Sequence, residues 1–161
     1  MVLQFLIKKL ANFRFHWPCT WAVLLGYILL CTPVHAVESI AIIVNENGPL
    51  THISKAEVRE IYLGETRFVE GIRIIPIQGP EGPLKESFLT IVIGQPSKAY
   101  KLHWTKKVFQ EGISLPPVKG HPAEIIEWVK EQPGAIGYVP RKLLDGQSGV
   151  RTLFILEMVK P

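Results

Sequence analysis

The sequence predicts an α/β domain in which a mainly parallel or mixed sheet is flanked by helices. Short apolar runs rich in β-branched residues predict strands, and segments with apolar residues at helical spacing separate most of them. Turn residues, chiefly glycine and proline, divide these elements. The predicted order after residue 36 is β-α-β-α-α-α-β-β, and strands separated by helices are typical of an α/β layer.

Residues 1–36 have the pattern of an export signal peptide. An uncharged apolar stretch covers residues 17–30, and the small-residue sequence Val-His-Ala at 34–36 suits cleavage by a signal peptidase. The basic residues that precede the stretch are Lys8, Lys9 and Arg14. We expect cleavage before Val37 and a periplasmic location. An uncleaved membrane anchor is the alternative, because the stretch is close to the ~20 residues that a membrane helix needs.

The composition after this leader excludes several classes of function. Both cysteines, Cys19 and Cys31, lie in the leader, so residues 37–161 contain no thiol for a disulfide, a thiolate metal site or a nucleophile. The formal charge of the whole chain is +4, but three of its 18 basic residues belong to the leader, which leaves 15 against 14 acidic residues. A nearly neutral domain does not suit a general nucleic-acid binder. We expect residues 37–161 to form one domain that depends on its hydrophobic core.

The first predicted strand and helix have clear boundaries. Residues 40–44 form a continuous apolar run that indicates a strand covered on both faces, and turn residues end it. Ser54 and Glu57 have the spacing of a capping box, and Gly64 suits a left-handed helix end. The pair expected to form a hydrophobic staple is Ile53 and Val58. The sequence therefore predicts a short capped helix between Ser54 and Gly64.

The middle of the chain predicts one further strand and two helices. Residues 72–77 indicate a second strand, which the turn-rich segment 79–83 closes. A helix can begin at Pro83, since proline is tolerated in the first helical position. Its apolar residues at helical spacing are Leu84, Phe88, Ile91 and Val92. The next helix is expected from Pro96 to about Gln110, with Leu102, Trp104, Val108 and Phe109 as its core contacts.

The last part of the chain predicts a helix and two strands. Residues 111–120 indicate a loop, and a helix follows over residues 122–131 with Ile125, Trp128 and Val129 facing inward. A Pro-Gly turn then leads into a small-residue, β-branched strand at 135–139. One helical turn is expected at 141–145, and a final strand at 150–156.

Two segments together resemble a known family. The capped helix, Ile-Ser-Lys-Ala-Glu-Val-Arg-Glu-Ile-Tyr-Leu-Gly at 53–64, and Pro-Gly-Ala-Ile-Gly-Tyr-Val at 133–139 are similar to one lobe, the second, of the phosphate-type periplasmic substrate-binding proteins of ABC transporters. The resemblance implies a single-lobe type II periplasmic-binding-protein-like domain. Full-length members of that family have two lobes that close on the ligand, and this chain has room for one.

The resemblance also implies a function and a set of partners. It implies an exported solute-binding-like domain that binds phosphate or another small oxyanion weakly or together with a partner. An open half-site leaves one side of the ligand in water, so we expect weak binding by the isolated lobe. Two sources of the missing wall remain open, a homodimer that faces its own turn and an envelope partner protein. Components of an ABC transporter are further candidate partners.

The turn from residue 78 to residue 84 is the expected ligand-binding site. It leaves a strand and enters a helix, a place where free backbone N–H groups and the helix dipole favour an anion. The expected ligand-facing residues are Gln78, Gly79, Glu81, Gly82 and Leu84. In the family that the chain resembles, the matching turn has a Gly-Ser-Gly-Thr type sequence preceded by an arginine.

The chain departs from that family pattern at several positions. Gln78 falls roughly at the place of the arginine, Glu81 and Gly82 replace the Ser-Gly pair, and Pro83 replaces the threonine. Proline provides neither a hydroxyl nor an N–H group. A carboxylate at Glu81 can occupy the place of a bound anion, so a tight turn with an acidic helix cap is the alternative interpretation.

A basic and aromatic segment offers a second candidate surface. The helix expected at 96–110 contains Lys98, Lys101, Lys106 and Lys107 around Tyr100, His103 and Trp104. Such a surface suits an acidic partner, while the alternative is a core-facing aromatic side and a solvated lysine side. A periplasmic protein-interaction or signalling module that reuses the lobe as a scaffold, without transport, is therefore the rival function.

The sequence predicts no catalytic residue, no cofactor and no metal site. The histidines after the leader, His52, His103 and His121, have no further ligand at suitable spacing. The chain has no nucleophile elbow, phosphate loop or dinucleotide-binding glycine motif. We therefore expect a non-enzymatic protein; the sequence leaves open the identity of the ligand, the oligomeric state and the cleavage of the leader.

Overall fold

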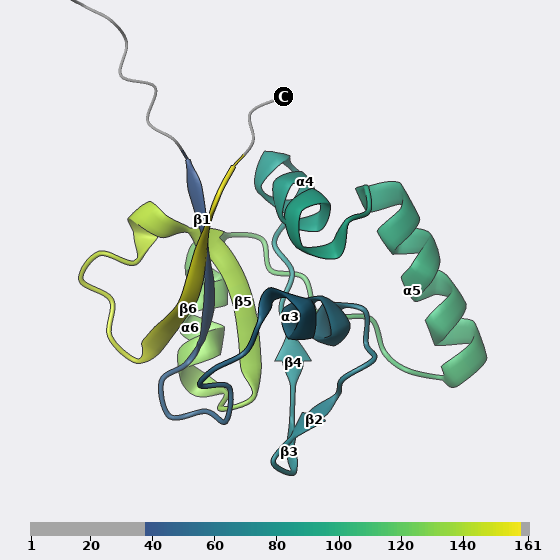
Figure 1. The fold of residues 1–161 in the computed structure, drawn as a ribbon, viewed down its shortest axis with the longest axis horizontal. Coiled ribbons are helices and arrows are strands. Elements are labelled where there is room, and N and C mark those ends of the chain that lie inside the picture. Colours follow the sequence, from purple (N-terminus) through teal and green to yellow (C-terminus); the bar gives the residue numbers. More distant parts are fainter. Residues whose placement is uncertain (1–37, 159–161) are drawn as a thin grey trace, which may run out of the picture. The chain divides into compact units, whose positions relative to one another are not determined.

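The computed structural model describes residues 38–158 (Figure 1). The expected signal peptide at 1–36 lies outside these residues. No helix within residues 38–158 combines the length and the apolar character that crossing a bilayer requires. The elements, in chain order, are β1 Ser39–Asn45, α3 Lys55–Tyr62, β2 Phe68–Val69, β3 Ile72–Arg73, β4 Ile75–Pro76, α4 Pro83–Phe88, the π-helical segment η1 Leu89–Ile93, α5 Ser97–Glu111, α6 Pro122–Glu131, β5 Ala135–Pro140, the 3-10 turn η2 Arg141–Leu143 and β6 Val150–Glu157.

The main sheet is mixed, as the sequence predicts, and its strand order is β4-β5-β1-β6. β1 lies antiparallel to both of its neighbours, with Ile42 opposite Tyr138 on β5 and Phe154 on β6. β4 and β5 pair in parallel. The two longest strands, β1 and β6, are neighbours in the sheet and come from the beginning and the end of the described chain; β6 is at the edge.

Alternate residues of β1 belong to two apolar clusters, as expected for a strand with both faces covered. Ile40 and Ile42 pack with residues of α3, α4, η1 and α5. Ala41 and Ile43 pack with residues of α6, which lies behind the sheet in the view of Figure 1. Four helical elements, α3, α4, η1 and α5, therefore pack on one face of the sheet, and α6 packs on the other.

Helix α3 confirms the capping prediction. The Ser54 hydroxyl accepts the N–H of Glu57, and the Glu57 carboxylate accepts the N–H of Ser54, so both halves of the capping box are present. Ile53 and Val58 lie in the same apolar cluster. Gly64 has a φ of 71°, and a Cβ atom there would come within 2.8 Å of the Trp104 ring. Gly64 therefore ends the helix and also makes room for the indole.

The prediction of one strand at 72–77 is wrong, because the run divides between two sheets. Ile72–Arg73 pairs with Phe68–Val69 in a separate hairpin that the sequence analysis did not anticipate. The hairpin turns through Glu70 and Gly71, both with positive φ, at 51° and 79°. Only Ile75–Pro76 joins the main sheet. One apolar run in the sequence therefore contributes to two strands, β3 in the hairpin and β4 in the main sheet.

The two middle helices differ in part from expectation. The helix that starts at Pro83 changes to a π-helical turn after Phe88. In α5, Trp104 is buried, but Leu102 is 56% and Phe109 is 85% exposed, so their prediction as core residues is wrong. At 100° per residue, Leu102 lies about 200° around the helix from both Tyr100 and Trp104, which face the core.

The remaining elements confirm the prediction closely. Helix α6 covers the residues expected for it, and Ile125 and Val129 are buried. β5 includes the whole predicted run 135–139, and β6 includes 150–156. The expected helical turn after β5 is the 3-10 turn η2.

Candidate functional site

The chain between β4 and α4 forms the corner where the sequence places the candidate site. Gln78 is buried there, and its backbone makes an isolated bridge with Val118. Its N–H donates to the carbonyl of Pro117 at 2.9 Å, and its own carbonyl accepts the N–H of Lys119 at 2.9 Å. The Gln78 side chain donates to the Tyr100 hydroxyl at 3.4 Å. Both backbone groups of Gln78 are therefore already paired within the protein.

Gly79 is buried beside Gln78, and its amide is also satisfied internally. The Gly79 N–H donates to the Tyr138 hydroxyl at 3.1 Å. The Tyr138 ring stacks on Phe88 with ring centroids 4.1 Å apart and planes 7° from parallel. A rigid aromatic pair thus holds the acceptor in place. The expectation that free amide groups point outward is wrong for Gln78 and Gly79.

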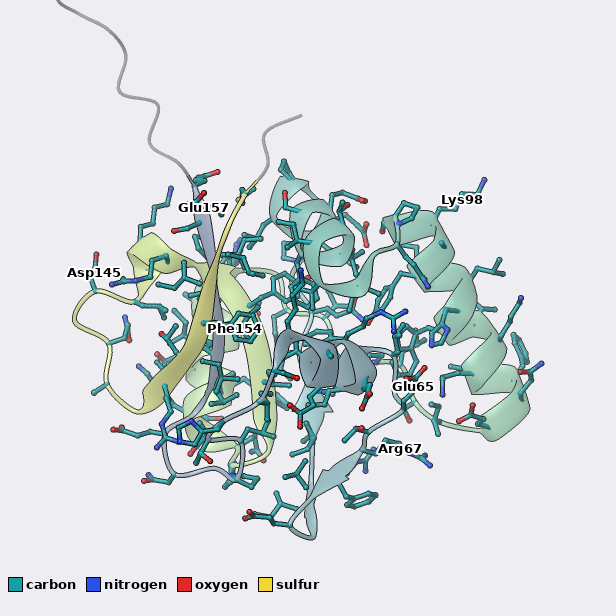
Figure 2. The ribbon with its side chains drawn as sticks, in the orientation of Figure 1. Glu65, Arg67, Lys98, Asp145, Phe154 and Glu157 are labelled. Carbon is teal, nitrogen blue, oxygen red and sulfur yellow. The ribbon has the colours of Figure 1, made fainter. Side chains whose placement is uncertain are left out.

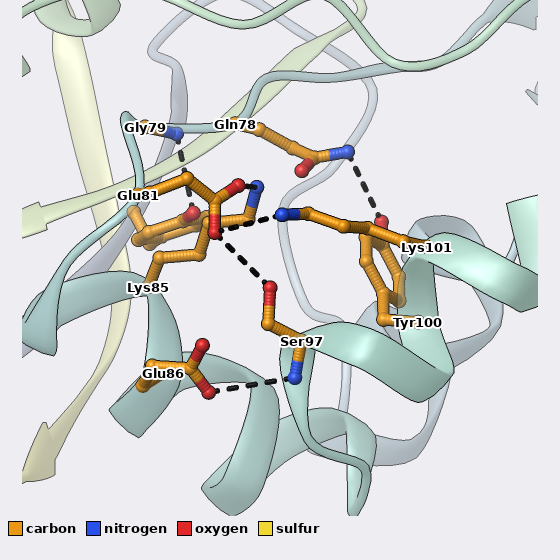
Figure 3. A network of polar contacts seen from close by, with 9 residues as sticks. Gln78, Gly79, Glu81, Lys85, Glu86, Ser97, Tyr100 and Lys101 are labelled. Carbon is orange, nitrogen blue, oxygen red and sulfur yellow. Dashed lines mark hydrogen bonds and ion pairs between the residues drawn. The ribbon is translucent and has the colours of Figure 1, made fainter.

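Glu81 is the centre of a polar network between α4 and α5 (Figure 3). Its Oε1 lies 2.7 Å from the Lys85 ammonium group. Its Oε2 accepts the Ser97 hydroxyl at 3.1 Å and lies 3.3 Å from the Lys101 ammonium group. The hydrogen bond from Lys85 is the main reason that the pKa of Glu81 is lowered, with Lys101 and Ser97 adding to the effect. Glu81 is therefore a carboxylate surrounded by two ammonium groups and a hydroxyl.

Lys85 and Ser97 give this network its fixed geometry. The Lys85 side chain is almost wholly buried, so its charge needs a partner of opposite sign. Ser97 is buried at the start of α5, and its N–H donates to the Glu86 carboxylate at 3.4 Å. Two acidic residues near α4 thus contact the first residue of α5, which ties the two helices together at the corner.

Gly82 and Leu84 complete the predicted set. Gly82 has a φ of 151°, a conformation that favours glycine, and nothing lies within 4 Å of where its Cβ would be. No side chain caps α4, so the interpretation of Glu81 as a helix cap is wrong; its carboxylate turns to Lys85, Ser97 and Lys101 instead. Leu84 is half-buried against the larger apolar cluster. Among the five predicted ligand-facing residues, Glu81 is the one with a charged side chain, and that side chain is about half exposed.

Three buried tyrosines, Tyr62, Tyr100 and Tyr138, make hydrogen bonds beneath the surface of the corner. The Tyr62 hydroxyl donates to the carbonyls of Ile77 and Ile136, and the Tyr100 hydroxyl donates to the carbonyl of Tyr62. Burial raises the pKa of Tyr62, Tyr100 and Tyr138. Their hydroxyls therefore stay protonated at physiological pH and serve as hydrogen-bonding groups.

Sequence reasoning missed Lys85 and Ser97 as members of the site. The spacing of four residues between Glu81 and Lys85 is a signal that was available, because opposite charges at this spacing commonly pair; here Glu81 lies two residues before α4 begins. Ser97 and Lys101 also differ by four positions, but only the packing of α5 against α4 brings them to Glu81. No local pattern contains that information.

The basic and aromatic surface predicted on α5 does not form as one surface. Tyr100 and Trp104 face the core, and His103 contacts the carbonyl of Leu63 at 2.9 Å. Lys101 belongs to the Glu81 network, and Lys107 pairs with Glu111 at 3.1 Å. Within residues 38–158, no group of three histidine, aspartate or glutamate side chains is arranged to hold a metal ion.

Comparisons by sequence and by structure give different answers. No protein-family model matches the sequence, and no curated protein matches it. Solved structures do match at the level of the fold. An ABC-type phosphate transport receptor of Vibrio cholerae aligns with a TM-score of 0.54 and 14% identity over 72% of this chain and 45% of its own.

Two further solved structures match in the same way. The PstS protein of Borrelia burgdorferi aligns with a TM-score of 0.56 and 16% identity, over 72% of this chain and 46% of its own. A candidate phosphate ABC transporter substrate-binding protein of Clostridium perfringens, solved with bound phosphate, has a TM-score of 0.56 and 17% identity, over 72% of this chain and 44% of its own. In each case the match spans less than half of the larger protein. The described part of this chain therefore has the fold of one lobe of the phosphate-type substrate-binding proteins of ABC transporters.

Proposed function

We propose that this chain is an exported, periplasmic solute-binding-like domain that binds phosphate or another small oxyanion at the corner formed by residues 78–84. One observation carries the proposal: Lys85, Ser97 and Lys101 converge on the two oxygen atoms of Glu81. Ammonium and hydroxyl groups around a carboxylate are the same groups that bind an oxyanion. The corner thus has the chemistry for an anion, and the chain's own carboxylate occupies it.

This occupancy explains why binding by the isolated domain should be weak. An external oxyanion has to displace Glu81 or lie beside it, and two like charges ~4 Å apart repel by about 4 kcal/mol at an effective dielectric of 20. A second wall would bury more of the ligand and compensate for this cost. We propose that a partner supplies that wall, whether a second copy of the chain, another envelope protein or a component of an ABC transporter.

The test compares phosphate binding by the wild type and by Glu81→Ala in a calorimetric titration. We expect no submillimolar affinity for the wild type and an affinity at least about tenfold higher for Glu81→Ala, because the resident negative charge is gone. Adding Lys101→Ala to Glu81→Ala should abolish the gain. The matched control is Glu127→Ala, which removes a carboxylate paired with Lys130 on α6. Equal affinities for the wild type and Glu81→Ala would refute the proposal.

A protein-interaction or signalling module is the second candidate, and the outer face of α5 favours it. Leu102 and Phe109 are exposed on the face of α5 that points away from the buried Tyr100 and Trp104. Exposed large apolar side chains are typical of contact surfaces when they cluster. If this function is correct, cross-linking in intact cells will join the wild-type protein to a partner. The double variant Leu102→Ser with Phe109→Ser will lose that cross-linked product, whereas Glu81→Ala will keep it.

A further inference from the structure

A groove of about 480 Å³ lies between the β2–β3 hairpin and the segment 112–117. Its buried lining is apolar and includes Ile61 of α3, Trp104 of α5 and Ile74, which lies between β3 and β4. These three side chains are called the floor of the groove. None of the residues 78–84 lines it, so it is separate from the corner. Its volume lies within the range of ordinary ligand and peptide pockets.

The rim of the groove combines exposed apolar side chains with positive charge. Phe68 is 62% exposed on the hairpin side, and Leu115 is 60% exposed on the opposite side. Arg67 and Arg73 both line the groove from the hairpin. Arg73 lies directly opposite Phe68 in the strand register, and Figure 2 shows Arg67 beside Glu65 where the chain enters β2.

The two arginines have no carboxylate partner within residues 38–158. Neither guanidinium takes part in an ion pair, and no aspartate or glutamate lines the groove. Three glutamates lie near these arginines in the sequence, Glu60, Glu65 and Glu70, but none of them lines the groove, and Glu60 accepts the Thr66 hydroxyl at 3.2 Å. An arginine fork binds carboxylates in a planar, two-bonded geometry, so the two arginines that line the groove are complementary to an acidic ligand.

The segment 113–115, on the side of the groove opposite the hairpin, has backbone N–H and C=O groups without a backbone partner among the described residues. Within the described chain, Ile113, Ser114 and Leu115 make no hydrogen bond to another backbone group. They lie outside any helix or strand. An extended peptide lying along them would pair with these groups, as in the addition of a strand to an exposed edge.

We propose that this groove docks an extended, acidic segment of a partner protein. Carboxylates of the segment bind Arg67 and Arg73, and apolar side chains between them contact Phe68, Leu115 and the floor. A small inorganic anion does not use the apolar floor. A second copy of this chain does not fit either, because outside its helices no stretch within residues 38–158 has two acidic residues within four positions.

The test uses the protein as expressed from its full sequence and a short fluorescent peptide in which glutamate alternates with leucine and phenylalanine. We expect binding by fluorescence anisotropy that weakens as salt is added. Arg67→Glu with Arg73→Glu should weaken it at least about tenfold, since attraction becomes repulsion. Lys98→Glu with Lys106→Glu is the matched control, because it reverses the same number of exposed charges on α5, and it should leave the affinity unchanged.

Further variants keep the result interpretable. Arg67→Gln with Arg73→Gln should give an intermediate loss, and its unfolding temperature should match that of the wild type. Glu81→Ala should bind the peptide normally, which separates this proposal from oxyanion binding at the corner. The proposal is overturned if a peptide with glutamine in place of glutamate binds equally well, if the α5 control weakens binding equally, or if sedimentation shows a dimer that the arginine variants abolish.

Discussion

The ammonium group of Lys85 lies 2.7 Å from Oε1 of Glu81, and the two side chains differ sharply in exposure, at 5% for Lys85 and 55% for Glu81. A buried positive charge is thus neutralised by a carboxylate that reaches it from the surface. Because Glu81 also contacts Ser97 and Lys101 on α5, this pair links the stability of the corner to the groups that we propose for anion binding.

Replacing Glu81 with glutamine should destabilise the fold. Glu81→Gln leaves Lys85 buried without an opposite charge, an arrangement that costs 3–5 kcal/mol when both partners are buried. Because Glu81 is more than half exposed, solvent screening reduces the expected loss to about 1–2 kcal/mol. Urea unfolding monitored by circular dichroism measures it.

The control for this change is Glu127→Gln, which breaks the 2.9 Å pair with Lys130 on α6. That pair lies at the surface, so its loss should cost no more than about 0.5 kcal/mol. Equal losses for the two variants would mean that the burial of Lys85 has no energetic consequence.

The contribution of Glu81 should also depend on pH. Its pKa is lowered in the folded state, chiefly by the hydrogen bond from Lys85. A lowered pKa gives stability that is present above the unfolded-state value, about 4.3 for glutamate, and is lost as the pH falls through the folded-state value. The stability difference between the wild type and Glu81→Gln should therefore shrink as the pH is lowered from 6 toward 3 in unfolding experiments. A constant difference would contradict this assignment.

Removing the Tyr138 hydroxyl should leave the Gly79 amide without its acceptor. Tyr138→Phe keeps the stacking on Phe88 but deletes the 3.1 Å hydrogen bond from Gly79. A buried N–H without a partner costs about 1–3 kcal/mol. Amide exchange measured by NMR should speed up at Gly79 more than in β1. Thr105→Ala, which removes an exposed hydroxyl on α5, is the control and should change neither exchange nor stability.

The parts of the fold that sequence predicts well are those determined by local chemistry. The α3 helix follows from the reciprocal bonds of Ser54 and Glu57, which lie three residues apart. The central strands follow from continuous apolar runs. The division of residues 72–77 between two sheets could not be predicted in this way, because it depends on pairing with residues outside the run. Residues 72–74 pair with the chain at 67–69, whereas Ile75 and Pro76 pair with β5.

The corner between β4 and α4 could be predicted from the sequence, but the contacts made there could not. The position of Glu81 before α4 follows from the sequence, and the binding of an anion there stays a prediction. The pairing of Gln78 with Pro117 and the contact of Ser97 with Glu81 join segments far apart in the chain. Only the packing of α5 and of the loop before α6 creates those contacts.

The glycines of the segment 133–139 should prove essential for the fold itself. A Cβ at Gly134 would collide with the backbone carbonyl of Arg73, and one at Gly137 would lie 2.5 Å from Ile125 on α6. Overpacking of this kind costs about 1–3 kcal/mol, and the Arg73 carbonyl belongs to the backbone of β3 rather than to a flexible side chain. Gly134→Ala and Gly137→Ala should each lower the urea midpoint, whereas Gly120→Ala, where the nearest atom lies at 3.6 Å, should not. Both clashes are with the protein's own atoms, so the two glycines of this segment are explained by the packing of the lobe.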